Sequence, residues 1–590
     1  MASDKVKLWR DRIKMAKKAH ADNFKEQAER NIRFYIGDQY DGEPDRNKRV
    51  PRNFIASSVD ALVPAVYSRD PQVLANPEVP DKGDKALNML ARGYARMFQS
   101  LINQTLHKIR FKKTMKRVVK DAVLTGRGYI KLGFDAQVGT KEGKKYEFEG
   151  GKKLPGVPLD QNLSDDFDHT ESVWAERVSP FRVFYDPEAT GLDDAAWCVI
   201  EVCLRIEKVR SNPIYKNGSK VKPSGAIAED LASAVVAGFD SEKTDPEGLD
   251  ADLQRVVLYE IWDKESRMVY VLADGNEDLD FLRESDWPFA DLNGFPITEL
   301  MPIPVTDSQW GECEVNRMIN GQEEFNVIRS MQFRHASRAM GGWTLQDGAA
   351  DKNDVQRFLN SDVMDVQVLR HPEGLKPLIP PNMPPDYFNY AKELKDDMSE
   401  NSKVPSWRRA GDMQNVRTAA QVSQLSQGLD AVLNEKIDVV EDFAEETISK
   451  MAVIMAEKYS MIHVVPVVGM QGTQWRRFDP KANREKLDIS ISQYSTTPAN
   501  PDMERQQYMQ FLPLLAQARQ AGVPVNLMVY LQRLAEKLAI HDWDEFLGPE
   551  SLAGMTPGQE QMMAGPMAQI MGQGIPAPMG QGMPMGGQGG

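Results

Sequence analysis

One apolar stripe, between Val422 and Met455, constrains the fold of this chain more than any other feature of its sequence. The segment contains no proline, and its apolar residues recur at steps of three and four, the period of one face of an α-helix. At ~1.5 Å per residue such a helix is about 50 Å long, whereas helices of globular domains usually span about three turns. We therefore expect an extended structural element that packs against copies of itself. The stripe consists of Val422, Leu425, Leu429, Leu433, Ile437, Val440, Ala444, Ile448, Met451 and Met455.

The composition is typical of a soluble folded protein. The 590 residues leave room for about four domains of ~150 residues, and 41% hydrophobic with 27% charged residues is an ordinary balance. Three cysteines indicate neither a disulfide framework nor a zinc module, so we expect assembly in a reducing cytoplasm. No apolar stretch approaches the ~20 residues of a membrane span, and the charged N-terminus predicts no signal peptide.

The net charge of −14 bears on nucleic-acid binding. A tight, general nucleic-acid binder is usually basic, so this charge argues against one. It does not exclude a protein that lets DNA slide, because a surface that repels phosphate keeps a duplex from sticking.

The hydrophobic periodicity predicts a helix-rich α+β fold with no internal repeat. Two predicted helices, over about 312–340 and 386–402, flank a small mixed unit that ends in paired prolines. We expect residues 551–590, rich in Gly, Met, Gln and Pro, to be disordered. Further helices are predicted over 5–35, 53–67 (interrupted by Pro64), 84–125, 502–521 and 526–546, strands over 129–134, 173–178, 182–185, 196–206, 254–272 and 487–491, a long hairpin or loop over 136–172 and a short helix near 226–237.

The motif search favours a protein without catalytic residues, metal or cofactor. Gly126-x-Gly128 follows a helix and precedes a strand, which is typical of a helix-ending turn and the reverse of a dinucleotide site. Asp274, Asn276 and Asp278 imitate a calcium loop, but Leu279 stands where the sharp turn needs glycine. The seven histidines show no zinc spacing. We therefore expect a protein that is not an enzyme; a nuclease or NTPase is the weaker alternative.

Two basic clusters remain. The cations between Lys108 and Lys120 alternate with apolar residues at helical spacing, so we expect a buried apolar face and a solvated cationic face; a subunit interface or a phosphate contact is the alternative. The second cluster lies beside Trp407 in a polar loop, where arginine and an aromatic ring can contact a duplex; ordinary surface arginine is an equal alternative. Its members, our candidate DNA-channel contacts, are Lys403, Arg408, Arg409 and Arg417.

Several short motifs follow one another between about residues 30 and 460. They are Phe34-Tyr35-x-Gly37-Asp38-Gln39-Tyr40, Asn53-Phe54, Asp70-Pro71, Asp121-Ala122-Val123-Leu124-Thr125-Gly126-x-Gly128, Pro180-Phe181-x-Val183-x-Tyr185-Asp186-Pro187, Gly311, the stripe of Gln322, Asn326 and Ser330, and Val404-Pro405. Each is weak by itself; a Gln/Asn/Ser stripe, for example, is typical of a hydrated helix face. In this order they make the chain resemble the portal proteins of short-tailed, double-stranded-DNA bacteriophages.

The resemblance implies a portal-type subunit with a wing, a helical stem, a small α/β clip and a helical crown, assembling as a ring of usually twelve copies at one capsid vertex. The parts would be a wing over 1–311, a first stem helix over 312–340, a clip over 341–385, a second stem helix over 386–402, a channel loop over 403–417, a long wing helix and strand over 418–500, crown helices over 501–550 and the tail over 551–590. The candidate subunit-packing residues are Leu425, Leu429, Leu433, Ile437 and Val440.

The resemblance also implies function and partners. The ring would nucleate the procapsid, dock the terminase large subunit, pass double-stranded DNA non-specifically during packaging and ejection, and join head to tail. Its partners would be the major capsid and scaffolding proteins, the terminase and tail adaptor proteins, with no membrane, no cofactor and a location at the portal vertex of the virion. The alternative is another virion structural protein, either a tail adaptor or an internal head protein.

Overall fold

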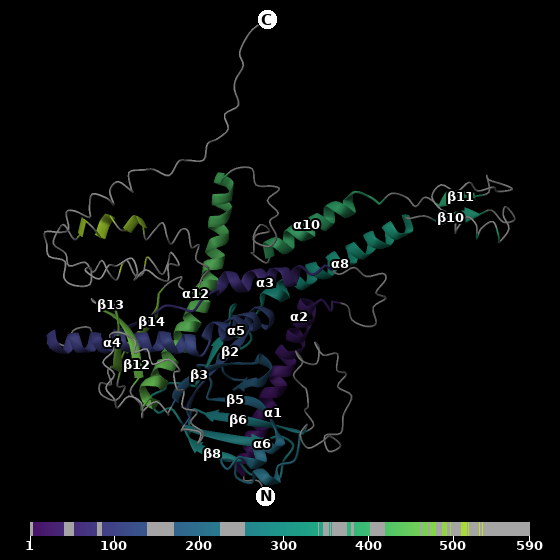
Figure 1. Cartoon of the computed structure of the whole chain (residues 1–590). Coiled ribbons are helices and arrows are strands. Elements are labelled where there is room, and N and C mark those ends of the chain that lie inside the picture. The colour runs from purple at the N-terminus through teal and green to yellow at the C-terminus, as the bar shows by residue number, and fades with distance from the viewer. Residues whose placement is uncertain are drawn as a thin grey trace. The chain divides into compact units, whose positions relative to one another are not determined.

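The computed structural model describes the chain in separate stretches (Figure 1), and each statement below concerns these residues. The chain divides into two compact units, Met1–Val467 with Trp475–Pro498, and Val468–Gln474 with Ala499–Gly590. Nearly all described residues belong to the first unit. The described stretches are 4–39, 52–78, 85–137, 170–224, 254–339, 342–345, 375–378, 383–401, 419–460, 463–469, 472–478 and 487–492, with single positions and short pieces elsewhere.

The chain begins with the predicted N-terminal helix, which the structure divides into α1 (Asp4–His20) and α2 (Glu26–Ile36) around a π-helical turn, Ala21–Lys25. Gly37 ends α2 with a φ of 101°, a conformation that glycine adopts without a steric penalty. Helix α3 (Phe54–Val66) continues through Pro64, which corrects the expected interruption. Pro64 lies in the last turn of α3, where the missing N–H removes a single helix hydrogen bond.

The predicted helix over 84–125 consists of two helices, α4 (Lys85–Lys108) and α5 (Phe111–Thr125). Arg110 divides them because its φ of 56° is left-handed and cannot continue a right-handed helix. Helix α5 has the expected distribution of side chains: Met115 is fully buried, whereas Lys113 and Arg117 are exposed.

The turn after α5 explains its two glycines. Gly126 caps α5 with a φ of 86°, and a Cβ at this position would lie 3.1 Å from the carbonyl oxygen of Gly311. A Cβ at Gly128 would lie 2.6 Å from the carbonyl oxygen of Val118, closer than a side chain can approach. The turn therefore ends the helix and lets distant backbone approach, and the prediction of a helix-ending turn is confirmed.

Two antiparallel sheets build the β-rich part. A three-stranded sheet has the order β3-β2-β9, and a five-stranded sheet has the order β4-β5-β6-β7-β8, in which neighbours in space are neighbours along the chain. Helix α1 runs beside the larger sheet (Figure 1), and Trp9 packs edge-on against Trp197. The strands are β2 (Gly128–Gln137), β3 (Thr170–Val178), β4 (Val183–Tyr185), β5 (Trp197–Arg205), β6 (Arg255–Asp263), β7 (Met268–Ala273), β8 (Arg283–Asp286) and β9 (Ile297–Leu300), with the short helix α6 (Ile206–Ser211) after β5.

The pairing of β1 (Val73–Pro77) with β14 (Leu487–Ile491) joins distant parts of the chain. Strand β14 is also held by α12, because Glu445 accepts a hydrogen bond from the backbone N–H of Ile491 at 2.9 Å. The neighbouring strands β12 (His463–Gly469) and β13 (Gly472–Phe478) form a two-stranded sheet. The predicted strand over 487–491 is confirmed, but its partner could not be seen in the local pattern.

The long predicted helix is confirmed as α12 (Ala419–Lys458), of 40 residues. Its C-terminal half is buried in the core of its own chain, where Thr447 shares a 2.8 Å hydrogen bond with Thr298 of β9. Ile437 and Val440 are 4% and 3% exposed within this core, so a second subunit cannot reach them. This corrects the expectation of subunit packing for these two residues, because the stripe serves the chain's own core there.

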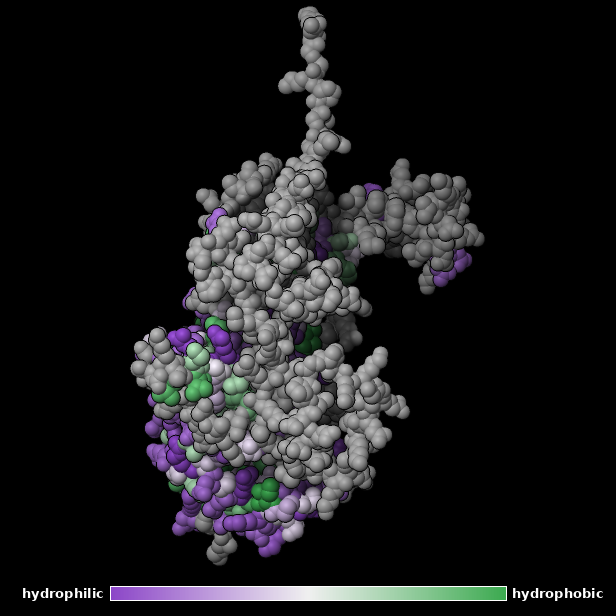
Figure 2. Space-filling model, turned by 60° about the vertical axis from the view of Figure 1, so that its left-hand side comes forward, coloured by the Kyte–Doolittle hydropathy of each residue, from purple (hydrophilic) through white to green (hydrophobic). Residues whose placement is uncertain are grey.

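Two further helices are α8 (Glu314–Ala339) and α10 (Asp386–Asn401), with the antiparallel pair β10 (Gly342–Leu345) and β11 (Leu375–Leu378) between them in sequence. These bounds closely match the predicted helices over 312–340 and 386–402. No helix within the described ranges is long and apolar enough to cross a bilayer. The described surface in Figure 2 is mainly hydrophilic and carries small, separate hydrophobic patches.

Candidate functional site

Helices α8 and α10 lie side by side in Figure 1 and form an antiparallel pair. We call this pair the two-helix element. Met398 of α10 packs over Gly321, where a Cβ would lie only 3.0 Å from Cγ of Met398. Further along α8, Gln332 Nε2 donates to the carbonyl oxygen of Tyr387 at 3.5 Å. Because position 321 faces 398 and position 332 faces 387, the helices run in opposite directions. The pair β10-β11 stands at the end where α8 finishes and α10 begins.

A small apolar cluster joins the two helices to α3. The ring of Phe54, the first residue of α3, meets Phe325 of α8 edge-on with centroids 4.9 Å apart, a favoured aromatic geometry. On the other side of Phe325, α10 contributes Leu394 and Met398, which are 6% and 2% exposed. The two-helix element is therefore attached to the body of the unit through one end of α3.

A chain of buried amides fixes α8 beside this cluster. Asn326 Nδ2 donates to Gln39 Oε1 at 2.6 Å, and Asn326 Oδ1 accepts from Gln322 Nε2 at 2.9 Å. Gln322 Nε2 also donates to the carbonyl oxygen of Arg52 at 2.7 Å, while its Oε1 accepts from the N–H of Phe54 at 3.0 Å. Each amide thus has partners of the correct polarity, as buried polar groups require.

The amide chain corrects the expectation of a hydrated stripe on α8. Gln322, Asn326 and Ser330 are 0%, 1% and 5% exposed. Ser330 Oγ donates to the carbonyl oxygen of Asn326 at 2.7 Å within the same helix. A polar stripe has the same sequence pattern whether water or other amides satisfy it, so only the tertiary structure distinguishes the two cases.

Asn53 lies next to the amide chain in sequence and bonds to the end of α2 and the start of α3. Its Nδ2 donates to the carbonyl oxygens of Phe34 and Tyr35 at 3.0 and 2.8 Å, which satisfies the end of α2. Its Oδ1 accepts from the N–H of Ala56 at 2.9 Å and caps α3, as asparagine commonly does. Three sequence motifs, at 34–39, at 53–54 and on α8, therefore meet at one joint.

The first turns of α8 have contacts with three further elements. Arg30 of α2 pairs with Glu323 at 2.7 Å, and Lys436 of α12 pairs with Glu314. Buried Asn31 donates to the carbonyl oxygen of Leu124 at 3.1 Å and contacts Cys313 Sγ at 2.9 Å. The exposed pair at Glu323 adds little to stability, but the buried amide at residue 31 ties the base of α8 to the end of α5.

A buried ion pair lies beside Trp310, a few residues before α8 begins. Arg127 is 2% exposed and lies 3.6 Å from Glu299 Oε1, with its guanidinium 4.3 Å from the ring centroid of Trp310. The hydroxyls of Tyr129 and Tyr185 donate to Glu299 at 2.6 and 3.2 Å. Burial raises the pKa of both phenols, so they remain neutral donors. A buried pair needs such additional hydrogen bonds to offset its desolvation.

His20 of α1 lies beside this pair, and its ring packs against Phe24, Phe184 and Trp310. Its Nε2 donates to the carbonyl oxygen of Pro180 at 3.1 Å, because a carbonyl can only accept. Burial lowers the pKa of His20 to about 4; the bond to Pro180 opposes this shift and the charge of Arg127 adds to it. His20 is therefore neutral at pH 7 and joins α1 to the motif that begins at Pro180.

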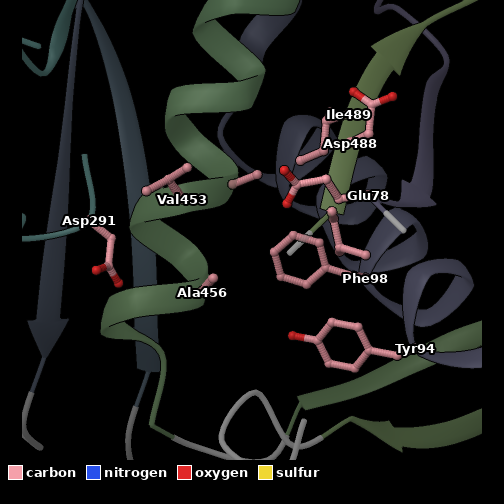
Figure 3. Close-up of a pocket in the computed structure, with 10 residues that line it drawn as sticks. Glu78, Tyr94, Phe98, Asp291, Val453, Ala456, Asp488 and Ile489 are labelled. Carbon is pink, nitrogen blue, oxygen red and sulfur yellow. The ribbon is translucent and has the colours of Figure 1, made fainter. Parts of the chain in front are cut away.

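A pocket of about 730 Å³ opens in the same unit, between α4, α12 and β14 (Figure 3). Tyr94 and Phe98 point into it from α4, opposite Ala456 of α12, while Val453 lies on the side of α12 that faces Asp291. No histidine, cysteine or serine is among its described lining residues. Its carboxylates come from Glu78, Asp291 and Asp488.

The predicted site residues fall into three groups. Lys403, Arg408, Arg409 and Arg417 lie outside the described residues, and so does most of the predicted crown. The backbone of α12 is described at Leu425 and Leu429 but their side chains are not, and Leu433 packs partly buried against the core. Among described residues, no three His, Cys, Asp or Glu side chains are grouped as metal ligands.

The amide chain predicts the effect of replacing Asn326 by leucine. Asn326→Leu preserves volume but leaves Gln39 Oε1 without its donor, so we expect a loss of about 1–3 kcal/mol in the free energy of unfolding. Urea unfolding followed by fluorescence measures the loss. The matched control is Asn320→Leu on the exposed face of α8, which should change the free energy by less than about 0.5 kcal/mol. Equal effects of both substitutions would contradict a special role of the amide chain.

The burial of His20 predicts a pH dependence. Because its folded pKa is about 4 and the ordinary value is 6.5, the unfolded chain binds the proton first. The stabilisation is complete above pH 6.5 and is lost as the pH falls towards 4, by on the order of 2–3 kcal/mol. Urea midpoints between pH 7 and 4 should fall less steeply for His20→Gln than for the wild type. An unchanged slope in His20→Gln would refute the assignment.

Comparison with known protein families agrees with the resemblance that the sequence motifs indicate. The family described as "Phage SU10 portal protein" matches residues 159–573, which is more than half of the chain and includes the two-helix element and α12. No curated protein matches the chain. The α+β fold, with its long helix and its joint of widely separated motifs, is thus found in a chain that belongs to the phage SU10 portal protein family.

Proposed function

We propose that this portal protein forms a closed ring at one vertex of the capsid and that duplex DNA passes through the ring's central channel. The observation that carries the proposal is the two-helix element, in which α8 and α10 run antiparallel with a small sheet between them in sequence and are joined to the body through buried amides. A rigid element of this kind can present a small end domain to partners while its root stays fixed.

The described elements support an assignment of parts. We assign α8 and α10 to the stem and residues 341–385, with β10 and β11, to the clip. Residues 1–311 form the wing and residues 418–500 its long helix and strand, because α12 packs into the same core as α3, β2 and β9. Residues 403–417 are assigned to a channel loop, 501–550 to a crown and 551–590 to a tail.

Charge supports passage of DNA without tight binding. The net charge of −14 disfavours adhesion of phosphate to the surface as a whole. A few cations from the channel loop would contact the backbone transiently, without reading bases, since any sequence must pass. We propose Lys403, Arg408, Arg409 and Arg417 for this role.

The proposed partners follow from the position in the virion. The ring, of twelve subunits by the family resemblance, would contact the major capsid and scaffolding proteins through the wing. The clip would bind the terminase large subunit during packaging and tail adaptor proteins afterwards. We propose no chemistry for the chain itself: ATP hydrolysis would come from the terminase. Leu425 and Leu429, on the half of α12 that precedes the core contacts, and half-buried Leu433 remain our candidates for subunit packing.

Electron microscopy of the purified full-length protein tests the proposal. We expect closed rings whose central hole is wide enough for duplex DNA, since the duplex must pass through it. Addition of scaffolding and capsid proteins from the same phage should place one ring per procapsid. A monomer that forms no ring at high concentration, even with these partners, would refute the portal assignment, and a solid or filamentous assembly would favour another virion structural protein.

The channel loop gives a second prediction. The double substitution Arg408→Ala with Arg409→Ala should leave rings intact, but the length or retention of packaged DNA should change because two phosphate contacts are lost. Packaged length is measured by pulsed-field electrophoresis of DNA from purified particles. The matched control replaces two exposed arginines of α4, Arg92 and Arg96, by alanine. Unchanged length and retention in the Arg408/Arg409 variant would show that these arginines are ordinary surface.

A further inference from the structure

Helix α10 presents three stripes along its length, each repeating at three and four residues. The first stripe packs against α8 in the apolar cluster with Phe325. The other two stripes flank the first on opposite sides. Tyr390 of one stripe stands one position before Ala391 in the sequence, and Lys392 of the other stands one position after it. The stripes are Ala391, Leu394 and Met398 towards α8, Tyr390, Glu393 and Asp397 on one side, and Phe388, Lys392 and Lys395 on the other.

The contacts of Tyr390 show that the stripe of Tyr390, Glu393 and Asp397 is continuous with one side of α8. Tyr390 is 45% exposed, and its hydroxyl donates to Glu324 Oε2 of α8 at 3.4 Å. Nearby negative charge raises the pKa of Tyr390, chiefly that of Glu324, with smaller contributions from Asp397 and Glu393. Three carboxylates from two helices therefore surround one exposed phenol.

The same side of α8 is also apolar. Val327 and Met331 follow Glu324 at steps of three and four and are 51% and 46% exposed. Arg334 lies on this side too, so the carboxylates outnumber the cation. We call this surface the acidic face; it consists of Glu324, Val327, Met331, Tyr390, Glu393 and Asp397.

The opposite side of the two-helix element differs in charge but is equally apolar. Phe388 of α10 and Phe333 of α8 are 57% and 45% exposed. Phe333 stands more than a third of a turn from the line of Val327 and Met331, on the other side of α8. We call this surface the basic face; it consists of Phe333, Phe388, Lys392 and Lys395.

We propose that the acidic face of one subunit packs against the basic face of the next subunit and that this contact repeats around the ring. The inference rests on the proposed function, because it names the partner of the stem as a second copy of this chain. A contact between two different faces of each copy is heterologous, and it closes into a ring when its rotation divides a full turn.

Two observations favour a second copy over other occupants. Large apolar side chains are exposed on both sides of the helix pair, and mutual packing would cover both sides at once. The charges are complementary between the faces, and like charges would meet if either face packed on itself. Duplex DNA fits less well, because the acidic face repels phosphate and paired bases offer no free ring for Tyr390 to stack on.

Charge reversal in two complementary variants tests the proposal in the full-length protein. The acidic-face variant carries Glu393→Lys and Asp397→Lys, and the basic-face variant carries Lys392→Glu and Lys395→Glu. In each variant both faces have the same sign, so the ring fraction, measured by electron microscopy and sedimentation, should fall by about tenfold or more. A one-to-one mixture should restore rings, since alternating copies bring opposite charges together in any ring with an even number of subunits.

Two controls accompany the variants. Asp396→Lys reverses a charge of α10 outside all three stripes and should leave the ring fraction unchanged. Circular dichroism and the urea midpoint show whether each variant is folded. Wild-type rings with both variants equally competent would overturn the face-to-face contact while the portal function stands, and so would single variants that fail without rescue in the mixture. Absence of rings in the wild type would overturn the portal function itself.

Discussion

The orientation of the two-helix element depends on the buried amides of Gln39, Asn326 and Gln322. An amide removed from water needs a donor or acceptor at every position, so it tolerates one arrangement of its neighbours. Rotating α8 by a single residue would move both amides away and leave the N–H of Phe54 and the carbonyl of Arg52 without partners. Apolar contacts such as Phe54 with Phe325 contribute attraction but tolerate sliding. The amides therefore select the register that the apolar cluster stabilises.

The buried ion pair near the start of α8 is under the same constraint, because each buried charged group also needs partners in fixed positions. Arg127 and Glu299 are buried together, and two tyrosine hydroxyls satisfy the carboxylate. Next to them, Gly126 lets the backbone of residue 311 approach a helix end, so that α8 starts where α5 stops. Directional contacts of this kind at the start of α8 resist rotation of the helix as well as its separation from the body.

Particular elements show how far the sequence could be interpreted. The periods of three and four predicted α8, α10 and α12 to within a few residues, because periodicity records which face is buried. They did not reveal the break at Arg110, since a left-handed residue leaves the apolar pattern intact. They also could not show whether Gln322 and Asn326 face water or other amides, or whether Ile437 and Val440 face another subunit or the chain's own core. The candidate channel arginines remain predictions.

By itself, the sequence determined the type and order of the main elements: a helix, an insert, a returning helix and then a long rod. Local spacing suffices for this, because burial of one face stabilises one period. Only the tertiary structure decided which distant residues meet: β14 beside β1, Gln39 beside Asn326, and Arg127 beside Glu299. Hydrogen bonds and ion pairs act over a few ångströms in space, and residues hundreds of positions apart carry no local mark of the partner that will satisfy them.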